Sequence, residues 1–277
     1  MPHDKLRVAT LNCWNISGPF EERVRLMREE IERLQPDLIG LQEIIVRRDG
    51  FHQGEQILAG LGYEVVYGAA TRWTETQSLL PHDAHGDGFG NLIASRHPVV
   101  ASTLRELPGI ETGERRSAVA ARVRTPWGVV PFVTTHFNWK ADHGWVRERQ
   151  AIALAAFVEE WKDEAEIPPI VVGDLNADPD ANEIRFLTGL ASLEGCSTCL
   201  HDAWRFAGDG SPGYTWDNRN PFAHYSFEPN RRIDYILVGP ADLHGRGWVE
   251  SARLAFTEPR DGVFPSDHFG LVAEIRV

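Results

Sequence analysis

The stretch Pro169-Ile170-Val171-Val172-Gly173-Asp174-Leu175-Asn176 sets a carboxylate and an amide directly after a short apolar run. A short run of branched apolar residues bounded by Pro and Gly is typical of a buried strand. A charged side chain at the end of such a strand is poorly placed to be surface decoration. We therefore interpret this stretch as a core strand whose end presents functional groups.

Five further polar signatures lie in or just after strand-like runs, from one end of the chain to the other. They are Thr10-Leu11-Asn12, Leu41-Gln42-Glu43, Thr135-His136-Phe137-Asn138, Arg232-Ile233-Asp234-Tyr235 and Ser266-Asp267-His268. Strand ends of this kind can converge on one rim of a sheet core. Carboxylate, amide and imidazole groups gathered there are the chemistry of a divalent metal site that acts on phosphate.

Strand–helix–strand patterns occur once in each half of the chain. Residues 21–34 and 145–162 show helical spacing of apolar residues, and strands are expected at 5–16, 37–43, 63–69, 170–173, 233–238, 248–256 and 269–277. Strands also dominate 90–137, whereas 71–90 reads as a long polar loop. This order predicts an α/β fold with two packed, mostly antiparallel sheets and helices outside. No stretch resembles a linker, so we expect a single domain over 1–277.

Composition excludes several classes of protein. The chain is 42% hydrophobic and 25% charged, and it has no apolar run near the roughly 20 residues that span a bilayer. Its start has no signal-peptide layout, and three cysteines are too few for a disulfide framework, so a cytoplasmic location is expected. The Cys196–Cys199 pair is interpreted as two loop thiols.

The net charge of −12 bears on the partner. Proteins that bind long duplex DNA by electrostatic attraction normally have a continuous stripe of basic residues on their surface. The basic residues of this chain are scattered along the sequence. Stable duplex binding is therefore disfavoured. A small or terminal phosphodiester, drawn in by a bound cation, is easier to accommodate.

Three residues are candidate ligands for Mg²⁺ or Mn²⁺. Magnesium prefers oxygen ligands and needs only one or two protein carboxylates beside the substrate's own oxygens. Glu43 is the best candidate because it places a charged side chain at the end of an apolar, strand-like run. Asp267 is the candidate from the C-terminal half. Asn12 can add an amide oxygen.

The remaining polar groups suit hydrolysis of a phosphodiester by water. Asp174 can orient or deprotonate the water, and Asn176 can donate to a phosphoryl oxygen. His268 can be kept protonated by Asp234, and His136 is a second imidazole that can donate to phosphate. The chain has no G-x-S-x-G nucleophile elbow, so direct attack by water is favoured over a covalent intermediate.

In order and wording, these signatures resemble the endonuclease/exonuclease/phosphatase superfamily along about 255 residues. The matching residues are Asn12 in TLNCWN, Glu43 in LQE, His136 and Asn138 in THFN, Asp174 and Asn176 in GDLNA, Asp234 in RIDYI, and Asp267 and His268 in SDH. The resemblance implies a four-layered α/β sandwich of the DNase I-like type and Mg²⁺- or Mn²⁺-dependent hydrolysis. It places the metal at Asn12, Glu43 and Asp267, the water at Asp174, the phosphate at Asn176, and transition-state stabilisation at His268 with Asp234.

Substrate contacts are predicted at Asn138, Trp216 and Arg116. Each has a structural alternative: Asn138 can close a turn, Trp216 and Trp139 can be core residues, and Arg115 and Arg116 can face solvent. Alternatives also stay open for the catalytic residues. Asp174 can form an Asx turn, Asp234 can hold Arg232 or Tyr235, and Glu43 can pair with Arg47. The segment at His82, Asp83, His85 and Asp87 can hold an extra metal, although a solvated loop is the simpler interpretation.

The sequence thus predicts a metal-dependent hydrolase of phosphodiester bonds. Its substrate is either a nucleic acid end or short strand, or a small or lipid diester of the sphingomyelinase type. The rival hypothesis is a non-catalytic binding module that retains the fold. Loss of a metal or water-activating residue would mark such a module, yet all eight of these positions are filled.

Overall fold

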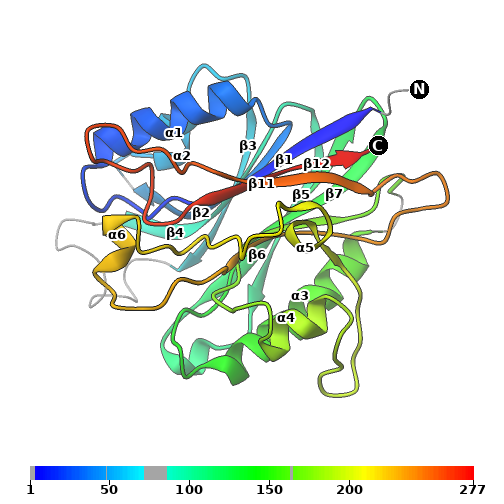
Figure 1. The fold of residues 1–277 in the computed structure, drawn as a ribbon. Coiled ribbons are helices and arrows are strands. Elements are labelled where there is room, and N and C mark those ends of the chain that lie inside the picture. The colour runs from blue at the N-terminus through cyan, green and yellow to red at the C-terminus, as the bar shows by residue number, and fades with distance from the viewer. Residues whose placement is uncertain (1–3, 48, 72–85, 163–164) are drawn as a thin grey trace.

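The computed structural model describes residues 4–47, 49–71, 86–162 and 165–277 (Figure 1). The strands are β1 (Lys5–Asn12), β2 (Leu38–Arg47), β3 (Glu64–Thr71), β4 (Gly86–Ser95), β5 (Val99–Leu107), β6 (Arg116–Thr125), β7 (Gly128–His136), β8 (Ile170–Asp174), β9 (His201–Asp202), β10 (Asp234–Val238), β11 (Val249–Ala255) and β12 (Gly270–Arg276). The helices are α1 (Phe20–Leu34), α2 (Gln53–Leu58), α3 (Gly144–Trp161), α4 (Asn182–Leu187), α5 (Ala203–Ala207) and α6 (Pro221–His224).

Two six-stranded sheets pack face to face. Their strand orders are β11-β12-β1-β2-β4-β3 and β5-β6-β7-β8-β10-β9. Helices α1 and α2 cover the outer face of the first sheet, and α3 and α4 cover the outer face of the second (Figure 1). The predicted four-layered α/β sandwich is therefore confirmed, and most neighbouring strands are antiparallel, as expected.

The exceptions are two parallel pairs at the centre of the sheets. β1 pairs with β2 across the α1 connection, and β7 pairs with β8 across α3. The carboxyl ends of parallel strands meet at one edge of a sheet, which is where ligands bind in α/β folds. The register sets Asn12 opposite Gln42 in the first sheet and His136 opposite Asp174 in the second.

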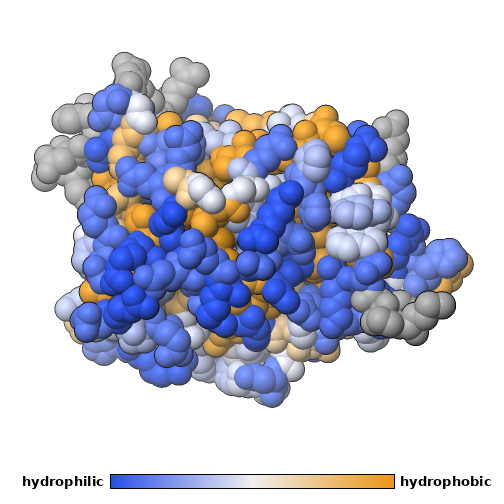
Figure 2. Space-filling view, turned by 90° about the horizontal axis from the view of Figure 1, so that it is seen from above, coloured by the Kyte–Doolittle hydropathy of each residue, from blue (hydrophilic) through white to orange (hydrophobic). Residues whose placement is uncertain are grey.

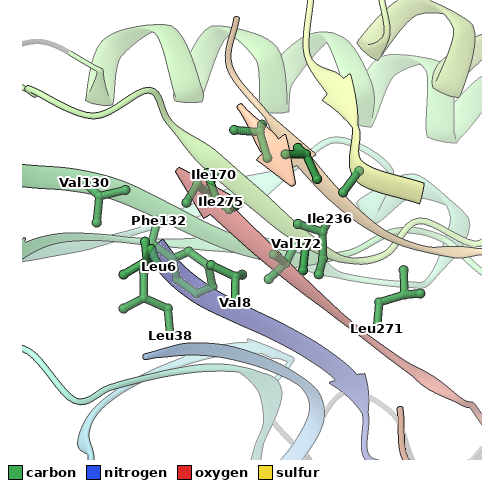
Figure 3. Packing of buried hydrophobic residues seen from close by; sticks show 14 of the residues in the cluster. Leu6, Val8, Leu38, Val130, Phe132, Ile170, Val172, Ile236, Leu271 and Ile275 are labelled. Atoms are coloured by element: carbon green, nitrogen blue, oxygen red, sulfur yellow. The ribbon is translucent and has the colours of Figure 1, made fainter. Parts of the chain in front are cut away.

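The core between the sheets explains why polar groups gather at that edge (Figure 3). Strand residues of period two face the other sheet, so Leu6 and Val8 of β1 pack against Ile170 and Val172 of β8 in one buried cluster. Continuing the same alternation places Asn12 and Asp174 on the same inter-sheet face. On this face, β1 and β8 thus begin with apolar residues and end with a polar residue at the rim.

Several boundaries differ from the sequence prediction. The first strand ends at Asn12 rather than at residue 16, and β2 continues past Glu43 to Arg47. Part of the loop expected at 71–90 is strand, because β4 begins at Gly86 and pairs with β2 and β3. The alternative metal site at His82, Asp83 and His85 lies outside the described residues.

The face of the molecule drawn in Figure 2 is mixed, with more hydrophilic than hydrophobic residues. On the face shown in Figure 2, hydrophobic residues lie in small groups among charged and polar ones. Among the helices of the described ranges, none is long and apolar enough to cross a bilayer.

Candidate active site

Asp174 lies at the floor of a pocket of about 470 Å³ at the rim between the two sheets. Its Oδ1 accepts the backbone N–H of Asn176 at 2.9 Å, so the Asx turn that the sequence left open does form. Its Oδ2 accepts from Asn12 Nδ2 at 2.9 Å and lies 3.4 Å from His136 Nε2 and 3.8 Å from His268 Nε2. One oxygen therefore shapes the turn while the other faces the pocket.

Gly173 allows Asp174 to reach this position. Its φ is +146°, and a Cβ there would lie 2.0 Å from the carbonyl oxygen of Thr135 on β7. Any side chain would push β8 away from β7 just before the functional residue. Glycine is required at this point because two strands approach closely.

His268 is held by Asp234, as predicted. Its Nδ1 lies 2.9 Å from Asp234 Oδ2, and both side chains are buried. Burial alone lowers the pKa of His268, but the carboxylates of Asp234 and Asp174 outweigh it and raise the pKa well above the usual range. His268 is therefore an imidazolium at neutral pH.

The pKa of His136 is shifted in the opposite direction. Burial, and then the positive charges of Arg116 and His268, lower the pKa of His136 well below its usual range. The two imidazoles that flank Asp174 are thus one neutral and one cationic. Such a split between neighbouring titratable groups is typical of acid–base sites.

The pKa of Asp174 is raised. Burial and the nearby charge of Asp234 raise its pKa to about 6, although His268, Asn12 and Asn176 stabilise the carboxylate. A base is most effective when its pKa lies near the working pH. Asp174 meets this requirement.

Glu43 reaches the pocket through a β-bulge. The register of β2 against β4 shifts between Leu41 and Ile44, and Glu43 has a left-handed φ of +59°. Leu41 and Ile44 both face the α1 side, so the extra residue gives Glu43 a place on the pocket wall. The alternative pairing with Arg47 is wrong, because Asn12 and Asn15 hold the Glu43 carboxylate at 3.3 and 2.9 Å.

Asp267 completes an oxygen-rich wall beside Glu43. Burial first, and then the carboxylate of Glu43, raise the pKa of Asp267 to about 7, against the opposing effect of His268. Ser266 Oγ ties this segment to β1, donating to Asn12 O at 2.6 Å and lying 3.1 Å from Asp267 Oδ1. Two carboxylates that repel each other across a shared space suit a hard dication, so the residues fit Mg²⁺ or Mn²⁺.

Asn12 and Asp234 stand behind the pocket wall. Asn12 Nδ2 bonds Glu43 and Asp174, and its Oδ1 accepts the N–H of Trp14 at 3.0 Å. Through Nδ2, Asn12 orients the two carboxylates, and its amide oxygen keeps a second lone pair, so the ligand role predicted for Asn12 stays a prediction.

A second group could hold a cation, since ligand atoms of Asp174, Asp234 and His268 lie within 4.8 Å of one another. A metal there would replace the His268–Asp234 hydrogen bond and meet a protonated imidazole. The wall formed by Glu43 and Asp267 fits better because it offers oxygen atoms without that conflict.

The outer walls combine aromatic and basic residues. Trp216 packs edge-on against His268 with ring centroids 4.8 Å apart, and Trp139 and Arg116 also line the pocket. Arg116 does not face solvent: it is 5% exposed, it pairs with Glu114, and its Nε and Nη1 have no hydrogen-bond partner among the described residues.

The structure does not bring Asn138 to the pocket. Its side chain is fully buried and donates to Glu114, while its backbone N–H donates to Gln150. Among the described residues that line the pocket, Asn138 is absent. The predicted phosphate contact is therefore corrected: Asn138 supports Glu114, the partner of Arg116.

Sequence reasoning missed three residues of the site. Asn15 bonds Glu43, Ser266 joins the end of β1 to the segment of Asp267, and Glu114 supports Arg116. Asn15 lies inside the quoted TLNCWN signature, and Ser266 begins SDH. Both signals were present, but neither reveals its partner without the fold.

The model of the endonuclease/exonuclease/phosphatase family matches residues 9–268. The chain belongs to this family. Nocturnin of Rattus norvegicus is 29% identical over 269 residues, which are 92% of this chain and 58% of that protein. Tyrosyl-DNA phosphodiesterase 2 of Gallus gallus is 24% identical over 283 residues, 97% of this chain and 67% of that protein. This family member therefore spans less than two thirds of the length of Nocturnin.

Solved structures of relatives share the fold. D. rerio TDP2 complexed with single-strand DNA product has a TM-score of 0.75 at 20% identity and covers 99% of both chains. The human Nocturnin catalytic domain with bound sulfate anion has a TM-score of 0.71 at 23% identity, covering 98% of this chain and 93% of that one.

Proposed function

We propose that this chain is a divalent-metal-dependent phosphodiesterase in which an activated water attacks phosphorus in line. The observation that supports this best is the environment of Asp174 Oδ2, which has a neutral and a cationic imidazole nitrogen at 3.4 and 3.8 Å. A carboxylate with a pKa of about 6 next to an imidazolium combines a base and a cation in one pocket. Membership of a phosphoesterase family supports the same reaction.

Glu43 and Asp267 would hold Mg²⁺ or Mn²⁺, with Asn12 and Asn15 orienting Glu43. When bound, the cation supplies positive charge that offsets the charge developing on the phosphate oxygens. The donor set supports this assignment, because both ligands are carboxylates and hard dications prefer oxygen. The choice between the two metals is part of the proposal.

The remaining steps belong to this chain's own side chains. Asp174 orients the water and takes its proton, and the imidazolium of His268 donates a hydrogen bond to a non-bridging phosphate oxygen. As the water oxygen bonds to phosphorus, the ester P–O bond opposite it breaks, and the leaving oxygen takes up a proton from solvent. Asn176 Nδ2 gives one hydrogen to Phe137 O at 3.1 Å, which leaves the other for phosphate. His136 was expected to donate to phosphate, but its Nε2 lies 3.4 Å from Asp174 Oδ2 and its pKa is lowered, so we propose that it holds Asp174 in place. Arg116 attracts the anionic substrate from the pocket wall.

The favoured substrate is a nucleic acid end or short single strand. Two relatives point that way: one is named a tyrosyl-DNA phosphodiesterase, and a solved relative holds a single-strand DNA product. Trp139 and Trp216 on the pocket wall can stack on bases. The net charge of −12 disfavours a stable duplex complex and keeps a small or lipid diester as the second candidate.

The first test is hydrolysis of bis-p-nitrophenyl phosphate with Mg²⁺ or Mn²⁺, with and without EDTA. We expect cleavage that EDTA abolishes and that Asp174→Asn loses. Cleavage that does not depend on metal would reject the proposal, and so would the absence of cleavage of every phosphodiester tested. A panel of single-stranded DNA, RNA ends, sphingomyelin and aryl diesters then separates the two substrate candidates.

Two broader proposals accompany the function. We propose that residues 1–277 act as a single catalytic domain, which the match to residues 9–268 supports. We also propose a cytoplasmic location, supported by three cysteines that are all free thiols. Limited proteolysis and cell fractionation test these two proposals respectively.

A further inference from the structure

Arg23 on α1 is a fully buried arginine whose hydrogen bonds avoid carboxylates. It is 0% exposed, and it heads the largest completely buried side chains of the described residues. Its guanidinium donates to the carbonyl oxygens of Ser17, Cys13 and Pro265 at 3.0, 2.8 and 3.2 Å. It also donates to those of Trp14 and Asn15 at 3.2 and 2.8 Å. Buried charges are normally paired, so this arrangement needs an explanation.

These carbonyls belong to two segments far apart in the sequence. Residues 13–17 follow β1, and Asn15 in this segment bonds Glu43 Oε2 at 2.9 Å. Pro265 directly precedes Ser266 and Asp267. One planar guanidinium therefore joins the segment that orients Glu43 to the segment that presents Asp267.

The backbone of the first segment is wrapped around this group. Trp14 and Asn15 have left-handed φ values of +49° and +39°; asparagine adopts this region more readily than most residues, whereas a bulky tryptophan does so at a cost. The Arg23 guanidinium also lies 4.9 Å from the centre of the Trp14 ring. The bonds from Arg23 compensate for this strained turn.

Arg23 also stays charged without neutralising the two carboxylates. Burial lowers its pKa only to about 10, since the fields of Asp267 and Glu43 oppose the effect of burial. Because its donors go to backbone carbonyls, the oxygens of Glu43 and Asp267 are left for other partners. Arg23 therefore holds the two segments in position without forming an ion pair with Glu43 or Asp267.

We propose that Arg23 is a positioning residue that sets the separation of Glu43 and Asp267 and so determines the affinity of the metal site. The inference rests on the proposed function only in that these two residues bind the metal. Lysine has one compact ammonium group and cannot reach five divergent carbonyls, whereas the arginine fork can. The charge is kept in Arg23→Lys, so the substitution isolates the geometric role.

The test is Mn²⁺ binding by isothermal titration calorimetry. We expect Arg23→Lys to weaken Mn²⁺ affinity by about tenfold or more while near-UV circular dichroism stays native. The matched control is Arg28→Lys: Arg28 lies on the same helix and donates to the carbonyls of Gln56, Ile57 and Ala59 at 3.1, 3.2 and 2.9 Å, away from the pocket. That variant should bind Mn²⁺ within about twofold of the wild type.

Glu43→Gln in the same titration separates the two proposals. Wild-type affinity in Glu43→Gln would overturn the metal site and this inference together. Weakened binding in Glu43→Gln, with wild-type affinity in a folded Arg23→Lys, would overturn the role of Arg23 alone.

If Arg23→Lys does not fold, hydrogen exchange on the wild type decides. Mn²⁺ should slow exchange in segments 13–17 and 265–268 over the same concentration range. Protection confined to one segment would show that the two are not coupled, which would overturn the inference.

Discussion

Replacement of Asp234 by asparagine separates charge from shape at the His268 pair. The asparagine carbonyl oxygen can still accept from His268 Nδ1, which lies 2.9 Å from Asp234 Oδ2 in the wild type. What is lost is the negative charge that keeps the imidazolium protonated, while Asp174 remains 3.8 Å from Nε2. The change should therefore lower the pKa of His268 while the imidazole stays in the same position.

The magnitude follows from the type of bond. A hydrogen bond to a charged group contributes about 1.5–3 kcal/mol, and about 1.4 kcal/mol equals one pKa unit or a factor of ten in rate. We expect the pKa of His268 to fall by about one to two units and kcat/KM by about 10- to 100-fold. Because the cation is the active form, the alkaline limb of the pH–rate profile should move to lower pH. The acid limb should move the same way, since Asp234 helps to raise the pKa of Asp174.

The assay is kcat/KM for an aryl phosphodiester from pH 5 to 10 at saturating Mn²⁺. Asp202→Asn is the matched control, because Asp202 is also buried and pairs with Arg232 at 2.7 Å, yet it lies off the pocket. Both variants should lose thermal stability, and only Asp234→Asn should shift the profile. An unshifted alkaline limb in Asp234→Asn would refute the view that this carboxylate maintains the His268 cation.

Four further predictions concern the pocket. Glu43→Gln should abolish metal-dependent turnover without lowering the melting temperature by more than a few degrees; unchanged activity at saturating Mn²⁺ would remove Glu43 from the metal site. Asp174→Asn should cost on the order of 10²-fold or more in kcat, as for a lost general base, and a rate within a few-fold of wild type would contradict this. In the wild type, activity should decline as the pH falls below about 6, where Asp174 becomes protonated; a flat profile from pH 5 to 7 would argue against it. Arg116→Met should raise KM about 10- to 100-fold, the effect of losing a charged hydrogen bond, with little change in kcat; an unaltered KM would place Arg116 outside substrate binding.

Several features of the site could be anticipated because they depend on local pattern. The alternation of apolar residues in Leu6 and Val8, or in Ile170 and Val172, identifies strands that bury one face. A polar residue that continues such a row must lie on the same face at the rim. That rule assigns Asn12 and Asp174 to the faces that bear the buried apolar residues of their strands, and the packing of the two sheets then brings them within hydrogen-bond distance.

Other features could not be read from the order of residues. Burial lowers the pKa of both His136 and His268; beside His136 the charge of Arg116 lowers it further, whereas beside His268 the carboxylates of Asp234 and Asp174 outweigh burial and raise it. Asn138 stands in a matching motif but turns away toward Glu114. These differences depend on neighbours that are distant in the chain, and pKa values respond to distance and burial in three dimensions.

The sequence by itself determined the α/β sandwich, the family and the set of residues able to act on phosphate, since periodicity and residue chemistry are local properties. Only the tertiary structure decided which of them meet. A one-residue bulge turns Glu43 toward the pocket, and a single arginine at position 23 joins segments more than 240 positions apart. Both depend on close packing between sheets and loops, where a shift of one residue reverses the direction of a side chain.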